Sequence, residues 1–428
     1  MYPVLLRQGL AFRGHDESYD SLNRGNFLEA LRLLANNNDK IAKVMLQNAP
    51  ENHQMTAPCI KKDIANAIAS EVTQVIINDL GEELFGIIVD ESRDISVKEQ
   101  MIVFIRYVHS SWHIVERLLG ITHVCDTTSM SLKVAIENLL TRHGLSISRI
   151  RGQGYDGASN RRGEFNGLKT LIMNENPSAF YVHCFAHQLQ LALVGVAKEN
   201  EEVGNFFFTV SQLCNIVCAS FKRMDSLRDK QLKMLIDSIS EDTIETGTGL
   251  NQEELNNRFN EKNTELLLCV TCFDPKNSFV KFDKDKLVRL TQFYPNDFSD
   301  IELQVLDNQL QTYFVDVTYD PAFSKLDGID ELAQKMVETG RHLDYTLVYL
   351  LLKLSLVLPV ATASVERAFS AMKLIKTSFR NRMGDDLLND CLVPYVEKDI
   401  FNQVSNEAVL QRFQHMRERR GILSRSSS

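Results

Sequence analysis

Acidic residues close an apolar run near residue 90. The run Phe85-Gly86-Ile87-Ile88-Val89 has no polar interruption, which is typical of a strand buried on both faces. It ends at Asp90 and Glu91, and Asp94 follows shortly after. A carboxylate at the end of a buried strand is costly to desolvate without a partner, and a cation is the usual partner. The alternative is that Asp90 caps the following turn through its own side chain.

A second acid stands in a similar position. The segment 146–155 is predicted to be a strand, and Asp156 follows it within the sequence GQGYDG at 152–157. These glycines lack the Lys-Ser/Thr of a phosphate-binding loop, so we interpret them as room for a tight turn around Asp156. On neighbouring strands, Asp90 and Asp156 would repel each other unless a proton or a metal intervened. Such a pair suits phosphoryl chemistry with two divalent ions ~3.5–4 Å apart.

Hydrophobic periodicity predicts the elements that would position these acids. After an amphipathic helix over 60–80, it predicts three strands, a helix and two further strand–helix pairs. Their ranges in chain order are 85–90, 100–109, 112–124, 129–143, 146–155, 164–175, 179–183 and 185–198. Three antiparallel strands followed by crossover units match a ribonuclease H-like α/β core, with a mixed five-stranded sheet and flanking helices. In that sheet the first and fourth strands lie side by side and parallel.

The composition is that of an ordinary globular protein. The chain has 428 residues, 44% apolar and 24% charged, which favours two domains over one. Its net charge of -9 argues against a globally basic nucleic-acid binder, although a local basic patch is compatible with DNA binding. Eight cysteines without disulfide-framework spacing fit a reducing compartment. The longest apolar run, 345–360, is shorter than the ~20 residues of a membrane span, so we predict a buried helix there.

Three long motifs resemble the hAT superfamily of transposases. They are VDESRDIS at 89–96, RGQGYDGASN at 151–160 and YVHCFAHQLQLAL at 181–193. Segments 8–18 and 23–29 resemble a subgroup that has a domain of unknown function ahead of the catalytic core, as in zinc finger MYM-type protein 1-like sequences. Segment 358–383, LPVATASVERAFSAMKLIKTSFRNRM, resembles the hAT C-terminal dimerisation region. The motifs occur in family order and cover most of the chain.

The resemblance implies a metal-dependent site of the DDE type. Asp90 and Asp156 match the first two metal-binding acids, Glu366 in SVERAFS matches the third, and Mg²⁺ or Mn²⁺ would be the cofactor. Glu366 lies more than 200 residues after Asp156, as in hAT enzymes, where a helical insertion interrupts the core. From the residues alone, Glu366 also fits a solvated helix carboxylate paired with Arg367 or Lys373.

Two further sets of residues are site candidates. Cys184-Phe185-Ala186-His187 matches the CxxH element beside the active site of the family. Because a structural zinc site needs four ligands, we predict that Cys184 lies in the core and that His187 supports the active site. Basic residues at roughly helical spacing are candidates for contacts with DNA phosphates, the alternative being a solvated basic face. These are Lys373, Lys376, Arg380 and Arg382.

Two departures from the family pattern argue against full activity. No zinc-finger array of the CxxC…HxxxH kind precedes residue 59, and the segment near 248–259 joins the two ends of the insertion domain without its TRW motif. We therefore predict five segments. They are a helical N-terminal region at 1–82, the first part of the ribonuclease H-like core at 83–200, a shortened all-α insertion at 201–325, a dimerisation region that completes the core at 326–410, and a basic, Ser-rich tail at 411–428.

The resemblance predicts a transposase-derived protein that homodimerises through 345–400 and lacks full transposase activity. In the family, a second subunit buries part of the apolar helix at 347–358. A nuclear location is expected from the family, and a cytoplasmic one otherwise. One alternative is an active enzyme in which water or a DNA 3′-hydroxyl attacks a phosphodiester, and another is a degenerate product with no selected role. Convergence of Asp90, Asp156 and Glu366 would favour the enzyme.

Overall fold

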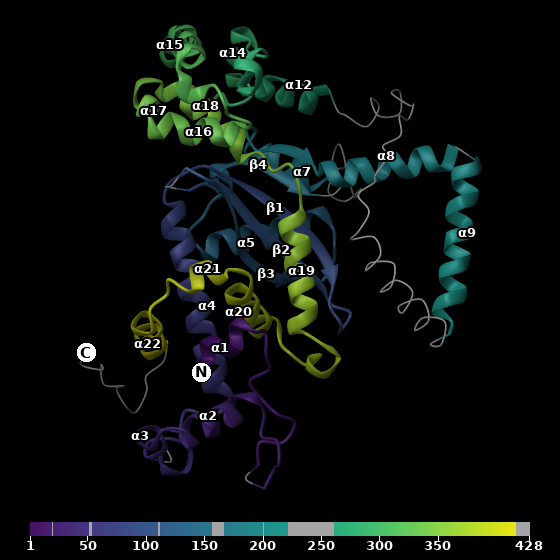
Figure 1. Cartoon of the computed structure of the whole chain (residues 1–428), viewed down its shortest axis with the longest axis vertical. Coiled ribbons are helices and arrows are strands. Elements are labelled where there is room, and N and C mark those ends of the chain that lie inside the picture. Colours follow the sequence, from purple (N-terminus) through teal and green to yellow (C-terminus); the bar gives the residue numbers. More distant parts are fainter. Residues whose placement is uncertain are drawn as a thin grey trace, which may run out of the picture. The chain divides into compact units, whose positions relative to one another are not determined.

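A mixed five-stranded sheet carries Asp90, the first of the predicted metal-binding acids (Figure 1). The computed structural model describes residues 1–18, 20–50, 54–109, 112–155, 167–199, 201–220 and 261–416, and its strand order is β3-β2-β1-β4-β5. The strands are β1 (Phe85–Arg93), β2 (Glu99–Val108), β3 (Ile114–His123), β4 (Ile150–Tyr155) and β5 (Phe180–His183). β1, β2 and β3 are antiparallel, whereas β4 pairs in parallel with β1 and with β5. The predicted order, with the first and fourth strands adjacent and parallel, is confirmed.

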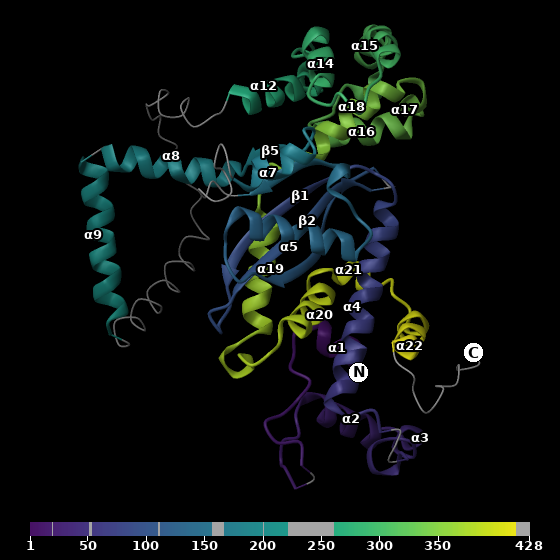
Figure 2. The same ribbon diagram turned by 180° about the vertical axis from the view of Figure 1, so that it is seen from behind.

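Helices cover both faces of this sheet. α19 (Ala363–Ile375) packs on β1 and β2 and lies in front of the sheet in Figure 1. α5 (Ser129–Arg142), which packs on β3 and on α7 (Leu168–Glu175), lies in front of it in the opposite view of Figure 2. One face is therefore covered by the helices between the strands, and the other by a helix from the C-terminal part of the chain.

Most of the remaining helices fall into an N-terminal and a C-terminal set. The N-terminal set is α1 (Tyr2–Arg7), α2 (Asn26–Asn36), α3 (Asp39–Ala42) and α4 (Pro58–Leu80). The C-terminal set is α12 (Glu261–Val270), α13 (Lys276–Phe279), α14 (Lys284–Thr291), α15 (Asp300–Tyr319), α16 (Ile329–Glu338), α17 (Arg341–Asp344), α18 (Thr346–Val357), α20 (Asp385–Val396), α21 (Lys398–Phe401) and α22 (Asn406–His415).

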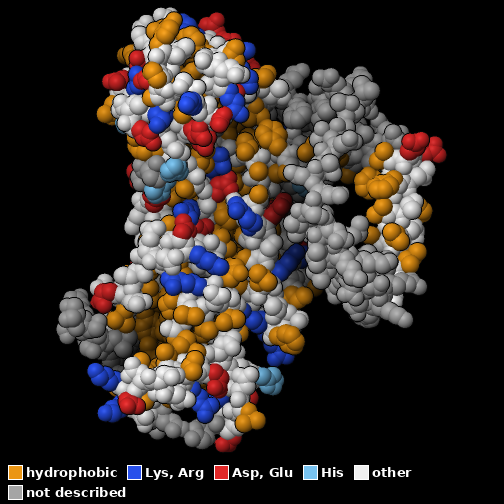
Figure 3. Space-filling model, in the orientation of Figure 1, with side chains coloured by type: hydrophobic (Ala, Val, Ile, Leu, Met, Phe, Trp, Pro, Cys, Tyr) orange, Lys and Arg blue, Asp and Glu red, His pale blue; other side chains and the backbone are white. Residues whose placement is uncertain are grey.

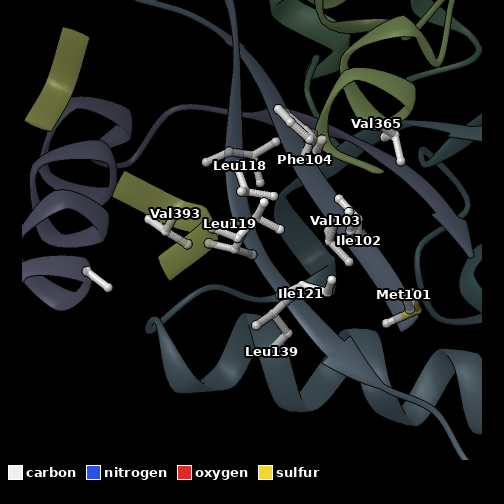
Figure 4. Packing of buried hydrophobic residues seen from close by; sticks show 14 of the residues in the cluster. Met101, Ile102, Val103, Phe104, Leu118, Leu119, Ile121, Leu139, Val365 and Val393 are labelled. Atoms are coloured by element: carbon white, nitrogen blue, oxygen red, sulfur yellow. The ribbon is translucent and has the colours of Figure 1, made fainter. Parts of the chain in front are cut away.

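The main hydrophobic core lies between the sheet and its helices. Its members come from both halves of the chain, which is why residues after 360 are needed to complete it. Figure 4 shows part of it, where β2 and β3 meet α5, α19 and α20. The labelled side chains are Met101, Ile102, Val103, Phe104, Leu118, Leu119, Ile121, Leu139, Val365 and Val393.

A second core surrounds α18, the helix formed by the longest apolar run. Nine of its residues are buried, packed by α14, α15, α16 and β2 of the same chain. We expected a second subunit to bury part of this helix, but the helices of the chain itself do so. The prediction of a buried helix is confirmed, and none of the helices in the described ranges is long and apolar enough to cross a membrane.

Two compact units can be separated by their internal contacts. Met1–Cys184 and Glu265–Ser428 form one, which holds the sheet and both cores, and Phe185–Thr264 form the other. α8 (Phe185–Glu199) and α9 (Glu201–Cys218) belong to the second unit. The sequence placed divisions at 200/201 and 325/326, so the five-segment organisation stays a prediction.

Candidate functional site

Asp90 lies near the end of β1, on the sheet face that is crossed by the chain between α18 and α19. Side chains alternate along a strand, so Gly86, Ile88 and Asp90 share one face. A Cβ atom at Gly86 would lie 2.4 Å from the backbone oxygen of Val357, at the end of α18. Asp90 is half-buried, and its Oδ1 accepts a hydrogen bond from the Glu91 N–H at 2.9 Å. That hydrogen bond fits the alternative of a local cap and leaves a metal-binding role open.

Glycines in β4 make this crossing possible. Cβ atoms at Gly152 and Gly154 would lie 2.6 Å from Pro359 Cδ and 2.8 Å from Pro359 Cβ. We interpreted these glycines as room for a turn around Asp156. Instead, they lie within β4 and admit Pro359. Two glycines on one face of a predicted strand are a signal of close backbone approach that could have indicated this. The crossing fixes where α19 begins on the sheet.

Glu366 lies in the first turn of α19 and is exposed. In the described part of the chain it forms no ion pair, and Arg367 instead donates from Nη2 to Ser364 Oγ at 3.0 Å. The pairing with Arg367 or Lys373 that we considered is therefore absent. The structure brings Asp90 and the helix that carries Glu366 to the same face of the sheet.

The other two candidates for catalysis lie outside the described part of the unit that holds the sheet. Asp156 lies outside the described residues, and His187 is a half-buried residue of α8, in the second unit. Cys184 is buried as predicted, and its Sγ accepts a hydrogen bond from Thr362 Oγ1 at 3.4 Å. Across the described ranges, no three or more His, Cys, Asp or Glu residues are grouped so that they could hold a metal. The complete set of metal ligands stays a prediction.

A buried ion pair joins the turn after β1 to the end of α19. Lys376 Nζ lies 2.6 Å from Asp94 Oδ2, and each side chain exposes only 1% of its surface. Ser96 Oγ and Gln100 Nε2 also donate to Asp94, at 2.6 and 3.0 Å. Burial opposes the charged form of Asp94, but the hydrogen bonds from Lys376, Ser96 and Gln100 outweigh it and lower the pKa of Asp94. This pair fixes α19 relative to the strand that carries Asp90.

Two family models match separate parts of the chain. Residues 1–167 match the family described as "ZMYM1/FAM200, RNase-like domain", and residues 337–400 match the "hAT family C-terminal dimerisation region". The first match includes β1, and the second includes α19, so the two matched segments meet at the sheet face that carries Asp90. The chain is a hAT-transposase-derived protein.

A human protein is also similar to this hAT-derived chain. It is the "52 kDa repressor of the inhibitor of the protein kinase", which is 22% identical over 253 residues. The aligned part covers 54% of this chain and 33% of that protein, so the chain spans about a third of the length of this relative. The similarity supports the family and carries no residue-level role.

The four basic residues that were predicted to contact DNA divide into a wholly or partly buried pair and an exposed pair. Lys376 was predicted to contact DNA, which is wrong because its ammonium group is buried against Asp94. Arg380 donates from Nη1 to the backbone oxygen of Gly9 at 2.8 Å, and burial lowers its pKa. Lys373 and Arg382 are exposed. Among the described residues on the face in Figure 3, Lys and Arg side chains are interspersed with acidic and hydrophobic ones and form no continuous basic surface.

Proposed function

We propose that this hAT-derived chain acts as a homodimer formed through its C-terminal region, without full transposase activity. The observation that carries the proposal is the exposure of apolar side chains within the matched dimerisation region. Leu374, in the last turn of α19, is 63% exposed, and Phe379, in the segment that joins α19 to α20, is 98% exposed. Burying such side chains against a second copy would contribute about 1.5–3 kcal/mol each. We therefore assign the dimer contact to Leu374 and Phe379. The apolar residues of α18 are not available for it, because other helices of the same chain already cover them.

The oligomeric state of paired variants tests this proposal. We expect the wild-type chain to sediment as a dimer, and the Leu374→Glu, Phe379→Glu double variant to dissociate at least a hundredfold more readily, since each 1.4 kcal/mol changes the dissociation constant tenfold. Val280→Glu is the matched control, because Val280 is 70% exposed but lies outside the matched region. A monomeric wild type, or a double variant that dimerises as tightly as the control, would overturn the proposal.

A second candidate function is metal-dependent cleavage of DNA phosphodiesters. The observation that favours it is that Asp90 and the helix of Glu366 share one sheet face, where carboxylate oxygens would suit Mg²⁺ or Mn²⁺. Calorimetric titration with Mn²⁺ tests this, with Asp90→Asn against the control Glu338→Gln, an exposed acid on α16. Binding that only Asp90→Asn abolishes would support a metal site. Equal binding by both variants, or none by the wild type, would leave the dimer as the function.

DNA binding and a nuclear location belong to the same proposal. Lys373 and Arg382 are the exposed basic residues that would contact phosphates. Each neutralised phosphate releases counterions, so DNA affinity falls as salt rises. In a Lys373→Gln, Arg382→Gln variant, the plot of log affinity against log salt should become less steep by about 2. An unchanged slope would exclude these two side chains as phosphate contacts.

A further inference from the structure

The helix α9, in the second compact unit, exposes apolar side chains along its length. Phe206 and Leu213 are 62% and 59% exposed, and Phe207, Val210 and Ile216 are exposed as well. Figure 3 shows hydrophobic side chains along this helix and acidic ones at its N-terminal end. An exposed apolar surface of this extent is typical of an interaction site.

The spacing of these residues is that of a helix that packs against another helix. Four apolar residues of α9 recur at intervals of three, four and three positions. They are Val203, Phe206, Val210 and Leu213. This spacing places them in one stripe, the seam, through which two helices interlock their side chains. With 3.6 residues per turn, Phe207 and Ile216 flank the seam, whereas Phe208 lies on the opposite side of the helix.

The seam is complementary to itself. In an antiparallel pair of α9 helices related by a two-fold axis at position 208, Phe206 would face the partner's Val210, and Leu213 would face the partner's Val203. Each large side chain would then meet a valine, which is the alternation of large and small residues that close packing favours. A second copy of the same helix therefore has the shape that the seam requires.

The charges of α9 favour the same antiparallel pair. Its sequence has no Lys, Arg, Asp or Glu from Val203 to Cys218, and the cores of protein interfaces are depleted in charged residues. Its acids, Glu201 and Glu202, stand at the N-terminal end. In the antiparallel pair the acids of the two copies would be roughly 20 Å apart, at 1.5 Å per residue, which exceeds the Debye length of ~8 Å. A parallel pair would place them side by side.

The apolar area that α9 exposes is also large enough for a stable contact. Aromatic side chains offer 150–250 Å² each and aliphatic ones less, so the seam and its flanks expose on the order of 450 Å² of apolar surface per copy. A standard interface buries about 800 Å² per partner, and about 56–65% of that area is apolar. One helix from each copy therefore supplies the apolar area that such an interface needs.

We propose that α9 packs antiparallel against α9 of a second copy of this chain, through the seam of Val203, Phe206, Val210 and Leu213. This contact goes beyond the dimer contact proposed above, because it lies outside the matched dimerisation region and does not use Leu374 or Phe379. A two-fold axis can relate both contacts within one dimer.

Sedimentation of the full chain tests the contact. The Phe206→Glu, Leu213→Glu variant should raise the dissociation constant of the dimer at least about a hundredfold, because two charges replace apolar side chains of the seam. The matched control is Phe208→Glu, a residue that is 65% exposed on the outer side of the same helix, and it should change the constant by no more than about threefold.

Three results would overturn the proposal. They are a monomeric wild type, a seam variant that associates as tightly as the control, and a seam variant that loses thermal stability at unchanged mass because its own chain covers α9. Leu374→Glu, Phe379→Glu probes the C-terminal contact separately, so either contact can fail while the other holds.

Mixing two single variants tests the antiparallel register. A chain with Phe206→Glu and a chain with Val210→Lys should each associate weakly with themselves. In the mixed pair the new glutamate would face the new lysine, while the other Phe206–Val210 contact stays intact. The mixture should therefore associate at least about tenfold more tightly than either variant alone. No gain in affinity on mixing would refute this arrangement.

Discussion

Replacing Lys376 by Met should destabilise the unit that holds the sheet by about 3–5 kcal/mol, the usual loss when one partner of a buried ion pair is removed. The side chains of Lys376 and Asp94 are each 1% exposed, so water cannot replace the lost ammonium group. Methionine keeps much of the apolar stem, so lost packing contributes little. The predicted loss is therefore that of a buried carboxylate without its cation.

The hydrogen bonds that remain set the size of this effect. Ser96 and Gln100 still donate to Asp94 in the variant, and hydrogen bonds to a charged group are worth about 1.5–3 kcal/mol each. We therefore expect the lower end of the range, about 3 kcal/mol. Adding Asp94→Asn removes the buried charge, so the double variant should be less destabilised than the sum of the single ones by about 2 kcal/mol or more.

Urea unfolding followed by the fluorescence of Trp112, the single tryptophan, measures these values. The matched control is Lys373→Met, an exposed lysine on the same helix, which should change stability by no more than about 0.5 kcal/mol. If Lys376→Met were as mild as this control, or if the two single variants were additive, the ion pair would not be holding α19 in place.

The same pair predicts how stability depends on pH. The pKa of Asp94 is lower in the folded chain than in the unfolded one, so its contribution is present above about pH 4 and is lost as the pH falls further. The stability difference between the wild type and the Asp94→Asn, Lys376→Met variant should shrink between pH 6 and pH 3. A difference that stays constant over this range would refute the assignment.

Two further predictions concern other buried positions. Gly154→Ala should cost about 1–3 kcal/mol, because its Cβ would lie 2.8 Å from Pro359, and an unchanged melting temperature would show that the crossing segment can move away. Burial raises the pKa of Asp390 to about 6, so ionised Asp390 destabilises the fold progressively as the pH rises from about 4 through 6. Asp390→Asn should therefore gain up to about 3 kcal/mol relative to the wild type between pH 4 and pH 8, and equal pH profiles would contradict this.

The order of the strands could be predicted because it depends on local patterns. Continuous apolar runs marked β1 and β2, the helical period marked α5, and the rules of connection placed the fourth strand beside the first. The resemblance of the C-terminal motif predicted that Glu366 belongs to the site. The residues around Glu366 alone also fitted a solvated carboxylate on a surface helix. Sequence reasoning thus identified the sheet unaided, and needed the family to assign α19 to it.

Contacts between distant parts of the chain could not be predicted in the same way. Asp94 and Lys376 are 282 residues apart, and no periodicity connects them. Lys376 has the helical spacing of a surface residue, and only the packing of α19 on β1 and β2 shows that its ammonium group points inward. Burial of α18 by α15 and α16 also depends on tertiary structure, since an apolar helix does not indicate which subunit covers it.

The motifs that identify the family therefore mix two kinds of residue. In VDESRDIS, Asp90 shares a sheet face with Gly86, which lies against the end of α18, whereas Asp94 holds Lys376 at the end of α19. A descendant without catalysis would still need Asp94, Lys376 and Pro359 to attach α19 to the sheet, although it could lose Asp90 or Glu366 with little effect on folding. The resemblance of these motifs is thus primarily evidence for the fold, and only secondarily for catalysis. Whether the chain still binds a catalytic metal depends on Asp90, Asp156 and Glu366. The manganese titration is the measurement that distinguishes a retained metal site from a retained fold alone.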